Sequence, residues 1–211
     1  MYSKLYHFLF AVLLTATPVF AESEAAEPQA VGAEPTAPAP LERVEVAEDE
    51  LVEIVGYLTA QSGGVPSLQL EEAAVASLAD GLEKCLSGEL NIMQFAQETV
   101  EAAFGEAQAR AEAIEASAEE IPAITAASLE KIGAVIVMQS GLQQLGFGAD
   151  AAALIRKGFV AGSLDAEPDP SLEAKMPAFQ EFIQVRVQVA QAKMQAEMMA
   201  AQEAAMADFA D

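Results

Sequence analysis

The side chains that most often do chemistry in enzymes are almost missing from this chain of 211 residues. The only histidine is His7 and the only cysteine is Cys85. His7 lies in the first 21 residues, which we expect to be removed as a leader, so a serine triad or a cysteine–histidine pair would lack its base. A zinc site would lack its usual cluster of histidine and thiolate ligands. A lone cysteine also cannot form an intramolecular disulfide. Cys85 follows Leu82 in a predicted helix, so we expect it to be buried, and an intermolecular bridge is the alternative.

Acidic residues are the remaining candidates for catalysis or metal binding, and the chain has 33 of them. Paired glutamates such as Glu71-Glu72 and Glu119-Glu120 are typical of solvated faces. No acidic group has the spacing of a calcium-binding loop. The sequence GFGAD at 146–150 follows no strand, so it indicates a turn between helices and not a phosphate-binding loop. The sequence thus predicts no catalytic residue, no metal site and no cofactor, and we expect a protein that is not an enzyme.

The first 21 residues have the pattern of a secretory signal peptide. One early lysine, Lys4, precedes a short apolar run, and small residues stand at the positions that favour cleavage after Ala21. The run is too short to be a good spanning helix, and no later segment is long and apolar enough to be one. The residue directly after the cleavage site is Glu22 and not a cysteine, so we do not expect a lipid anchor. The expected product is exported, in a bacterial periplasm, with no stable membrane span.

The charge of the chain excludes some classes of partner. The formal net charge is −23, and removal of the leader takes away Lys4 and no acidic residue, which leaves −24. Nucleic acid phosphates and anionic lipids repel such a chain, so neither is an expected partner. High negative charge also favours solubility, which is a sufficient explanation for it.

Residues 22–47 separate the leader from the rest of the chain. They are rich in alanine, glutamate and proline and contain no aromatic residue. Proline interrupts regular helix and the charge opposes collapse, so we expect a disordered, extended linker.

The rest of the chain contains an internal repeat with an offset of 77 positions. Residues 131–162 align without a gap on residues 54–85, and large apolar side chains keep the same phase in both segments. Two unrelated helical hairpins of similar composition are the alternative. The aligned glycines are Gly56 with Gly133, Gly64 with Gly141, and Gly81 with Gly158.

Both repeats have the apolar periodicity of helices, and the expected fold class is all-α. The first repeat, 48–120, is predicted to contain helices over about 49–62, 70–86 and 91–118. The second, 121–211, is predicted to contain helices over about 125–144 and 149–162 and a long helix from Pro170, which follows a capping aspartate. One face of this last helix is apolar, and its final part is expected to fray. That face comprises Leu172, Met176, Phe179, Ile183, Val187, Met194 and Met198.

The second repeat resembles a known domain. A small-residue helix with Gly133, a turn ending in Leu145-Gly146-Phe147, a helix with Gly158 inside it and a long third helix are similar to the amino-terminal domain of FKBP-type peptidyl-prolyl isomerases. This is the dimerising segment of the macrophage infectivity potentiator group and of related periplasmic isomerase-chaperones. The first repeat departs more, with Pro66-Ser67 in the turn and Cys85 where the second repeat has Gly162.

In the resembled family two chains dimerise by interweaving their first two helices, and the third helices project as arms. The resemblance implies that one chain here supplies both copies, as an intramolecular pseudo-dimer with long projecting helices; a homodimer is the alternative. The residues expected to pack the helices together are Gly56, Leu58, Leu78, Gly81, Leu82, Gly133, Ile136, Leu145, Phe147, Ile155, Gly158 and Phe159.

The catalytic domain of that family, which is rich in strands and has an aromatic pocket, has no counterpart in this sequence. The chain has no tryptophan, and Tyr57 is the only tyrosine after the leader. We therefore carry over no catalytic residue. By resemblance, the expected role is chaperone-like or dimerising, in envelope protein folding, with unfolded or partly folded proteins or a separate isomerase as partners.

A methionine series in the last helix is the candidate client-binding surface, because methionine adapts to varied apolar partners. Met194, Met198 and Met199 form it, with Met206 further along. The alternative is that these residues fill gaps in a core or lie in a frayed tail. The competing function is a structural or assembly module that makes homotypic or partner contacts without binding clients.

Overall fold

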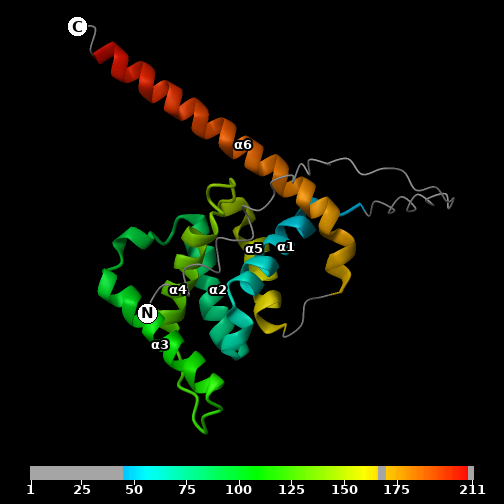
Figure 1. Cartoon of the computed structure of the whole chain (residues 1–211), viewed down its shortest axis with the longest axis vertical. Helices are drawn as coiled ribbons and strands as arrows, with labels where there is room; N and C mark the ends of the chain where they lie inside the picture. Colours follow the sequence, from blue (N-terminus) through cyan, green and yellow to red (C-terminus); the bar gives the residue numbers. More distant parts are fainter. Residues whose placement is uncertain (1–44, 166–169, 209–211) are drawn as a thin grey trace, which may run out of the picture. The chain divides into compact units, whose positions relative to one another are not determined.

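A computed structural model of the chain describes residues 45–165 and 170–208, with side chains up to residue 202. Within these ranges the protein is all-helical, with no strand (Figure 1). The expected signal peptide and all but the last three residues of the expected linker lie outside the described residues. The helices are α1 (Glu48–Ser62), η1 (Val65–Leu68), α2 (Glu72–Ser87), η2 (Ile92–Gln94), α3 (Gln97–Glu115), α4 (Ala126–Ser140), α5 (Ala149–Leu164) and α6 (Ser171–Asp208), where η marks a 3-10 helix.

Glycines in the left-handed conformation end the first helix of each half. Gly64, just after α1, and Gly141, at the end of α4, both have φ of 69°. A residue with a Cβ is strained in this conformation, so glycine sets the point at which the chain can reverse. The two positions differ by the offset of 77.

The helices of the two halves pair with each other. α1 packs against α5, and α2 packs against both α4 and α5. Among the described residues, α1 makes no comparable contact with α2, nor α4 with α5, although each is joined to the other by a short turn. These four helices, α1, α2, α4 and α5, are called the bundle below, and Figure 1 shows the two crossed pairs side by side.

Two glycines allow the crossed pairs to approach at backbone distance. A Cβ added to Gly56 in α1 would overlap the carbonyl group of Ile155 in α5. A Cβ added to Gly133 in α4 would overlap the carbonyl group of Leu78 in α2. Both the glycines and the carbonyls they meet differ by 77 positions. Only glycine lets helix axes come this close, and this compensates for its low helix propensity.

A second pair of contacts repeats the same geometry from the opposite helices. Gly158 in α5 meets the carbonyl group of Glu53 in α1, and Gly81 in α2 meets that of Glu130 in α4. The carboxylates of these two glutamates also bind lysines of the facing helix. Lys157 Nζ lies 2.7 Å from an oxygen of Glu53, and Lys84 Nζ lies 2.6 Å from one of Glu130.

The crossed helices enclose one apolar core, and its largest fully buried side chains come from both halves. They are Phe159, Leu78, Leu82, Leu129, Ile155, Val75 and Val137. Cys85 is also buried, as its helical position predicted, and burial raises the pKa of its thiol. Since apolar burial is the main stabilising term in folding, neither half would be expected to keep this core without the other.

α3 differs from its prediction in length and in position. It begins at Gln97, because η2 and an extended Phe95-Ala96 segment precede it, and it ends at Glu115. It packs against α4 and η1, with Ala103 fully buried, so it does not project as the expected arm. Arg110 fastens it by donating to the carbonyls of Leu68, Gln69 and Pro122, at 2.7 Å, 2.7 Å and 2.9 Å.

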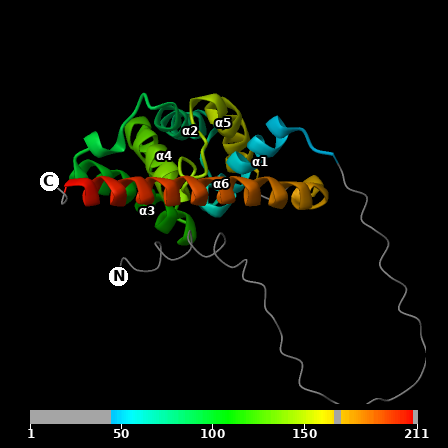
Figure 2. The same ribbon diagram turned by 90° about the horizontal axis from the view of Figure 1, so that it is seen from above.

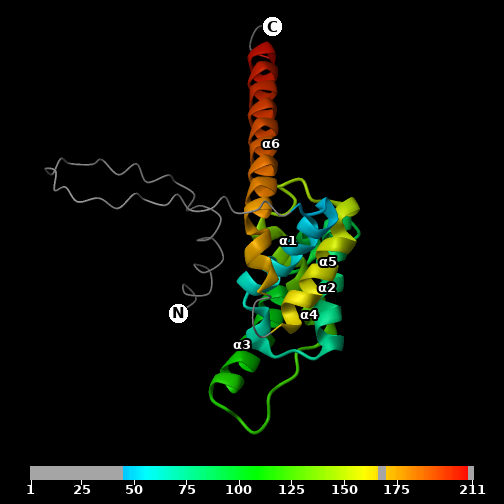
Figure 3. The same ribbon diagram turned by 90° about the vertical axis from the view of Figure 1, so that its right-hand side faces the viewer.

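α6 is the long helix that the sequence predicts. Figure 2 shows it crossing one side of the bundle, and Figures 1 and 3 show its later half running clear of the other helices. It remains helical to Asp208, where fraying was expected. Pro177 lies inside it and cannot donate to the preceding turn, and the first turns run in a different direction from the rest in Figure 1.

Candidate functional site

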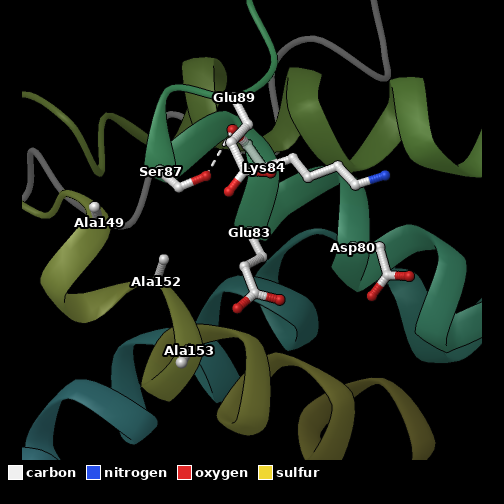
Figure 4. A pocket seen from close by; sticks show the side chains of 8 residues that line it. All are labelled: Asp80, Glu83, Lys84, Ser87, Glu89, Ala149, Ala152 and Ala153. Atoms are coloured by element: carbon white, nitrogen blue, oxygen red, sulfur yellow. Dashed lines mark hydrogen bonds between the residues drawn. The ribbon is translucent and has the colours of Figure 1, made fainter.

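A groove between α2 and the start of α5 is the first place to look for chemistry (Figure 4). α2 lines it with Asp80, Glu83 and Lys84, and α5 lines it with alanines. The charged groups already have partners in the protein. Arg156 lies 2.7 Å from Asp80 and 3.1 Å from Glu83, measured from guanidinium nitrogen to carboxylate oxygen.

The lysine of this groove is also committed to a structural contact. Lys84 donates to Glu130, and this hydrogen bond is the main cause that raises the pKa of Lys84 above its ordinary value. A lysine nucleophile or base needs its pKa lowered towards neutrality, which is the opposite direction. The groove therefore offers a network of surface ion pairs and no poised catalytic group.

Two further classes of site can be assessed on the described residues. Over 45–165 and 170–208, no three histidine, cysteine, aspartate or glutamate side chains are placed to share a metal ion. Within the same ranges, none of the helices combines the length and apolar character needed to span a membrane.

One arginine and several apolar side chains of α6, Phe179, Phe182 and Ile183, make the contact with the bundle. The guanidinium carbon of Arg186 lies 4.3 Å from the ring centre of Phe147 and 4.7 Å from that of Phe182. Phe147 comes from the turn before α5 and Phe182 from α6, and their ring centres are 6.2 Å apart. A cation over an aromatic face contributes about 0.5–2 kcal/mol, depending on how far it is removed from water.

Two ion pairs add to this contact at the first turn of α1. Arg186 lies 3.4 Å from Glu48, and Lys175 lies 2.6 Å from Glu50. Exposed pairs of this kind contribute at most about 1 kcal/mol each. The Nε of Arg186 is buried and has no hydrogen-bond partner among the described residues. The first half of α6 is therefore held by stacking and apolar packing more than by directed hydrogen bonds.

The second half of α6 exposes large apolar side chains. Beyond Ala190, every residue up to 202 is exposed. The large apolar side chains that are more than half exposed in this part of α6 are Val185 at 55%, Val189 at 64%, Met194 at 54%, Met198 at 60% and Met199 at 66%. Exposed apolar side chains gathered on one element mark an interaction surface more often than scattered single ones.

These side chains lie on two sides of the helix. Met194 and Met198 continue the side of α6 that contacts the bundle, beyond the point where the bundle ends, and are called the methionine side. A second set recurs at spacings of 4, 3, 4 and 3 residues on a different side, and is called the seam. The seam consists of Val185, Val189, Ala192, Ala196 and Met199.

Charge is also distributed unevenly between residues 45–165 and the exposed part of α6. Residues 45–165 include 20 acidic and 5 basic side chains, a net charge of −15. From 187 to 202 the only charged residues are Lys193 and Glu197, which cancel. Residues 187–202 of α6 are therefore a neutral, partly apolar segment of a strongly acidic protein.

Ten of the twelve residues predicted to pack the helices together are buried, and Leu58 and Leu145 are half-buried. Sequence reasoning missed Val65 and Leu142, which are 3% and 2% exposed. They also differ by 77 positions and follow the left-handed glycines, which was the available signal.

Sequence reasoning also missed the valines of the seam. Of the predicted client-binding residues, Met194, Met198 and Met199 are all exposed and none is part of a core.

No protein-family model, curated protein or solved structure matches this chain.

Proposed function

We propose that this chain is an exported, non-enzymatic helical protein with a chaperone-like role in envelope protein folding. The observation that carries the proposal is the exposed methionine side of α6, supported on an acidic bundle. Methionine is unbranched and polarisable, so such a surface can adapt to partly folded proteins of different sequence. The acidic bundle keeps the complex soluble and repels nucleic acid and anionic lipid.

In this proposal the bundle is an internal counterpart of an intertwined dimer, with each half of the chain taking the place of one subunit. Two pairs of glycine contacts related by the same offset support it. At about 1 µM, where weak association is dissociated, light scattering on the mature chain should report a folded particle of one chain's mass. A tight dimer at that concentration, whose helices exchange between chains, would contradict the internal pairing.

The client-binding role is tested by suppression of aggregation of an unfolded protein. We expect the mature chain to protect at stoichiometric ratio, and the double substitution Met194→Glu and Met198→Glu to lose most of the protection. The matched control is Gln184→Glu with Gln191→Glu, which adds the same charge at exposed polar positions of α6. No protection by the unaltered chain at stoichiometric excess would refute the client-binding role.

The non-enzymatic part of the proposal has a separate test. A prolyl-peptide isomerase assay should show no rate above background, and measurable turnover would contradict it. Docking of a separate isomerase, instead of direct client binding, predicts that protection appears only when both proteins are present. The competing function is an assembly module without clients, and the neutral stretch of α6 over 187–202 is the observation that favours it.

A further inference from the structure

We propose that the seam of α6 pairs with the same seam of a second copy of this chain, in antiparallel orientation. The seam residues recur alternately every four and three residues, which averages to 3.5. This is the period of a helix that packs along another helix, and it differs from the 3.6-residue period of a helix lying on a broad surface. The occupant of the seam is therefore expected to be a helix.

The composition of the seam suits a close helix pair. Ala192 and Ala196 lie at its centre, where small side chains allow the axes to approach, and larger Val189 and Met199 flank them. In an antiparallel pair centred on residue 194, Ala192 of one chain faces Ala196 of the other, and Val189 faces Met199. At the centre of the pair small residues meet small ones and large residues meet large ones, while Val185 at the end faces position 203, a glutamate.

Charge selects the antiparallel orientation. Lys193 and Glu197 stand on the same side of the seam, and glutamines 188 and 195 border the other side. Like sides face each other in an antiparallel pair, so Lys193 of each chain comes within about 3 Å, along the axis, of the level of Glu197 of the other. In a parallel pair the same two charges would face glutamines, without a partner of opposite charge.

The acidic bundles give a second reason. A parallel pair would bring two copies of residues 45–165, each of net charge −15, to the same end. In the antiparallel pair, the two Arg186 residues are separated by about 24 Å along the axis. This is about three times the Debye length of roughly 8 Å at physiological ionic strength, so the repulsion between the bundles is largely screened.

The seam also continues into a concave part of the surface. A groove between the start of α1 and α6 is lined by Val46, Leu51, Phe182 and Val185, together with charged groups of both helices. Val185 is the first residue of the seam, so a helix lying along the seam would end in this groove. The paired length of about 28 Å buries less than a standard interface of about 1,600 Å², so the association should be weak and reversible.

This inference is independent of client binding, because Met194 and Met198 lie on the opposite side of α6 and remain exposed in the pair.

The test uses the full mature chain in sedimentation or light scattering over a range of concentrations. We expect the mean mass to rise reversibly towards that of two chains. Ala192→Glu with Ala196→Glu, which places four carboxylates at the centre of the pair, should raise the dissociation constant at least tenfold. The control Gln184→Glu with Gln191→Glu should change it less than threefold.

Orientation is tested by spin labels at Gln184 and, separately, at Gln191, with Cys85→Ala as background. The antiparallel pair places the two copies of residue 184 about 30 Å apart along the axis and those of residue 191 about 9 Å apart. A parallel pair gives equal separations at both positions and would overturn the proposal. So would a chain that stays monomeric up to about 1 mM, or a control variant that dissociates as readily. If the alanine variant keeps its mass but loses client protection, clients and not a second copy occupy the seam.

Discussion

The helices that close the two halves of the chain, α3 and α6, are attached to the bundle by different kinds of contact. α3 is fixed by directed hydrogen bonds of two side chains that lie one helical turn apart. Arg110 donates to three backbone carbonyls, and Glu106 accepts from the Thr125 backbone N–H and from the Ser128 hydroxyl at 2.8 Å and 2.9 Å. Bonds of this kind define a single position, because each has a narrow range of distance and angle.

α6 has one arginine in the corresponding role, but its hydrogen bond to Glu48 is long, at 3.4 Å. The Arg186 guanidinium lies over the rings of Phe147 and Phe182, and its Nε has no partner among the described residues. From residue 191 to residue 202, the last whose side chain is described, every residue of α6 is exposed. The comparison suggests that α3 belongs to the structural core of the molecule, whereas α6 is a docked helix whose second half is available for other partners.

The largest expected effect comes from breaking the bundle on which both helices depend. Gly133→Leu would drive a side chain into the backbone of α2, where neither helix can move without opening the crossing. We expect a loss of more than about 3–5 kcal/mol, enough to prevent folding of a domain of ordinary stability. Circular dichroism and thermal unfolding measure this.

The matched control is Gly105→Leu in α3, because a Cβ at Gly105 meets nothing within 4 Å. Replacing a helical glycine at an open position should stabilise the protein by about 0.5–1 kcal/mol. If both variants fold equally well, the close approach at Gly133 is not required.

The next effect separates α3 from α6. Arg110→Met keeps an unbranched apolar stem but leaves three carbonyls without their donor. Since hydrogen bonds to a charged group contribute about 1.5–3 kcal/mol when buried and less when exposed, we expect a total loss of about 2–3 kcal/mol. Denaturant unfolding should show this as a lower midpoint, and a change below about 0.5 kcal/mol would place α3 with α6 as a merely docked helix.

The contrast between the two helices also explains which features could be predicted from sequence. The bundle helices and their glycines were predictable, because glycine at a helix interior and a phase of large side chains repeated over 77 positions leave a clear pattern. The burial of Ile155 and Phe159 follows from that pattern alone. The start of α3 could not be predicted, since the extended Phe95-Ala96 segment contains no proline or glycine that would indicate a break in the helix.

The position of each closing helix was beyond sequence reasoning for a physical reason. Arg110 reaches carbonyls that come from a turn and from a linker distant in sequence, and any residue has a carbonyl. The stacking of Arg186 depends on Phe147, 39 positions away, and no periodicity relates the two. The seam could have been found, because its spacing is explicit, but the apolar face towards the bundle dominated the pattern.

A smaller effect is expected from the anchor of α6. Arg186→Met should retain apolar contact with Phe147 and Phe182 but lose the cation–aromatic attraction, at a cost of about 0.5–1.5 kcal/mol. Global unfolding should change little. Hydrogen exchange should instead become faster in the first half of α6 while α1 and α5 keep their protection. Equal loss of protection in the bundle helices would mean that α6 is part of the cooperative core.

The smallest effect is a pH dependence confined to α3. The backbone N–H of Thr125, with smaller contributions from Ser128 and Lys131, lowers the pKa of Glu106 below its ordinary value of 4.5, against a partial opposing effect of desolvation. Because the folded pKa is the lower one, Glu106 contributes its stabilisation fully above the unfolded pKa, and this is lost as pH falls through the folded value. In Glu106→Gln the amide oxygen can still accept from Thr125 but its NH₂ cannot accept from Ser128, so we expect a loss of up to about 1 kcal/mol at neutral pH. The measurement is the unfolding free energy of the unaltered protein and of Glu106→Gln between pH 7 and pH 3, and the difference between them should shrink towards zero as the pH falls.

A difference that stays constant would mean that Glu106 holds α3 to α4 by packing and not by charge. α3 and α6 would then be attached more alike than their contacts indicate.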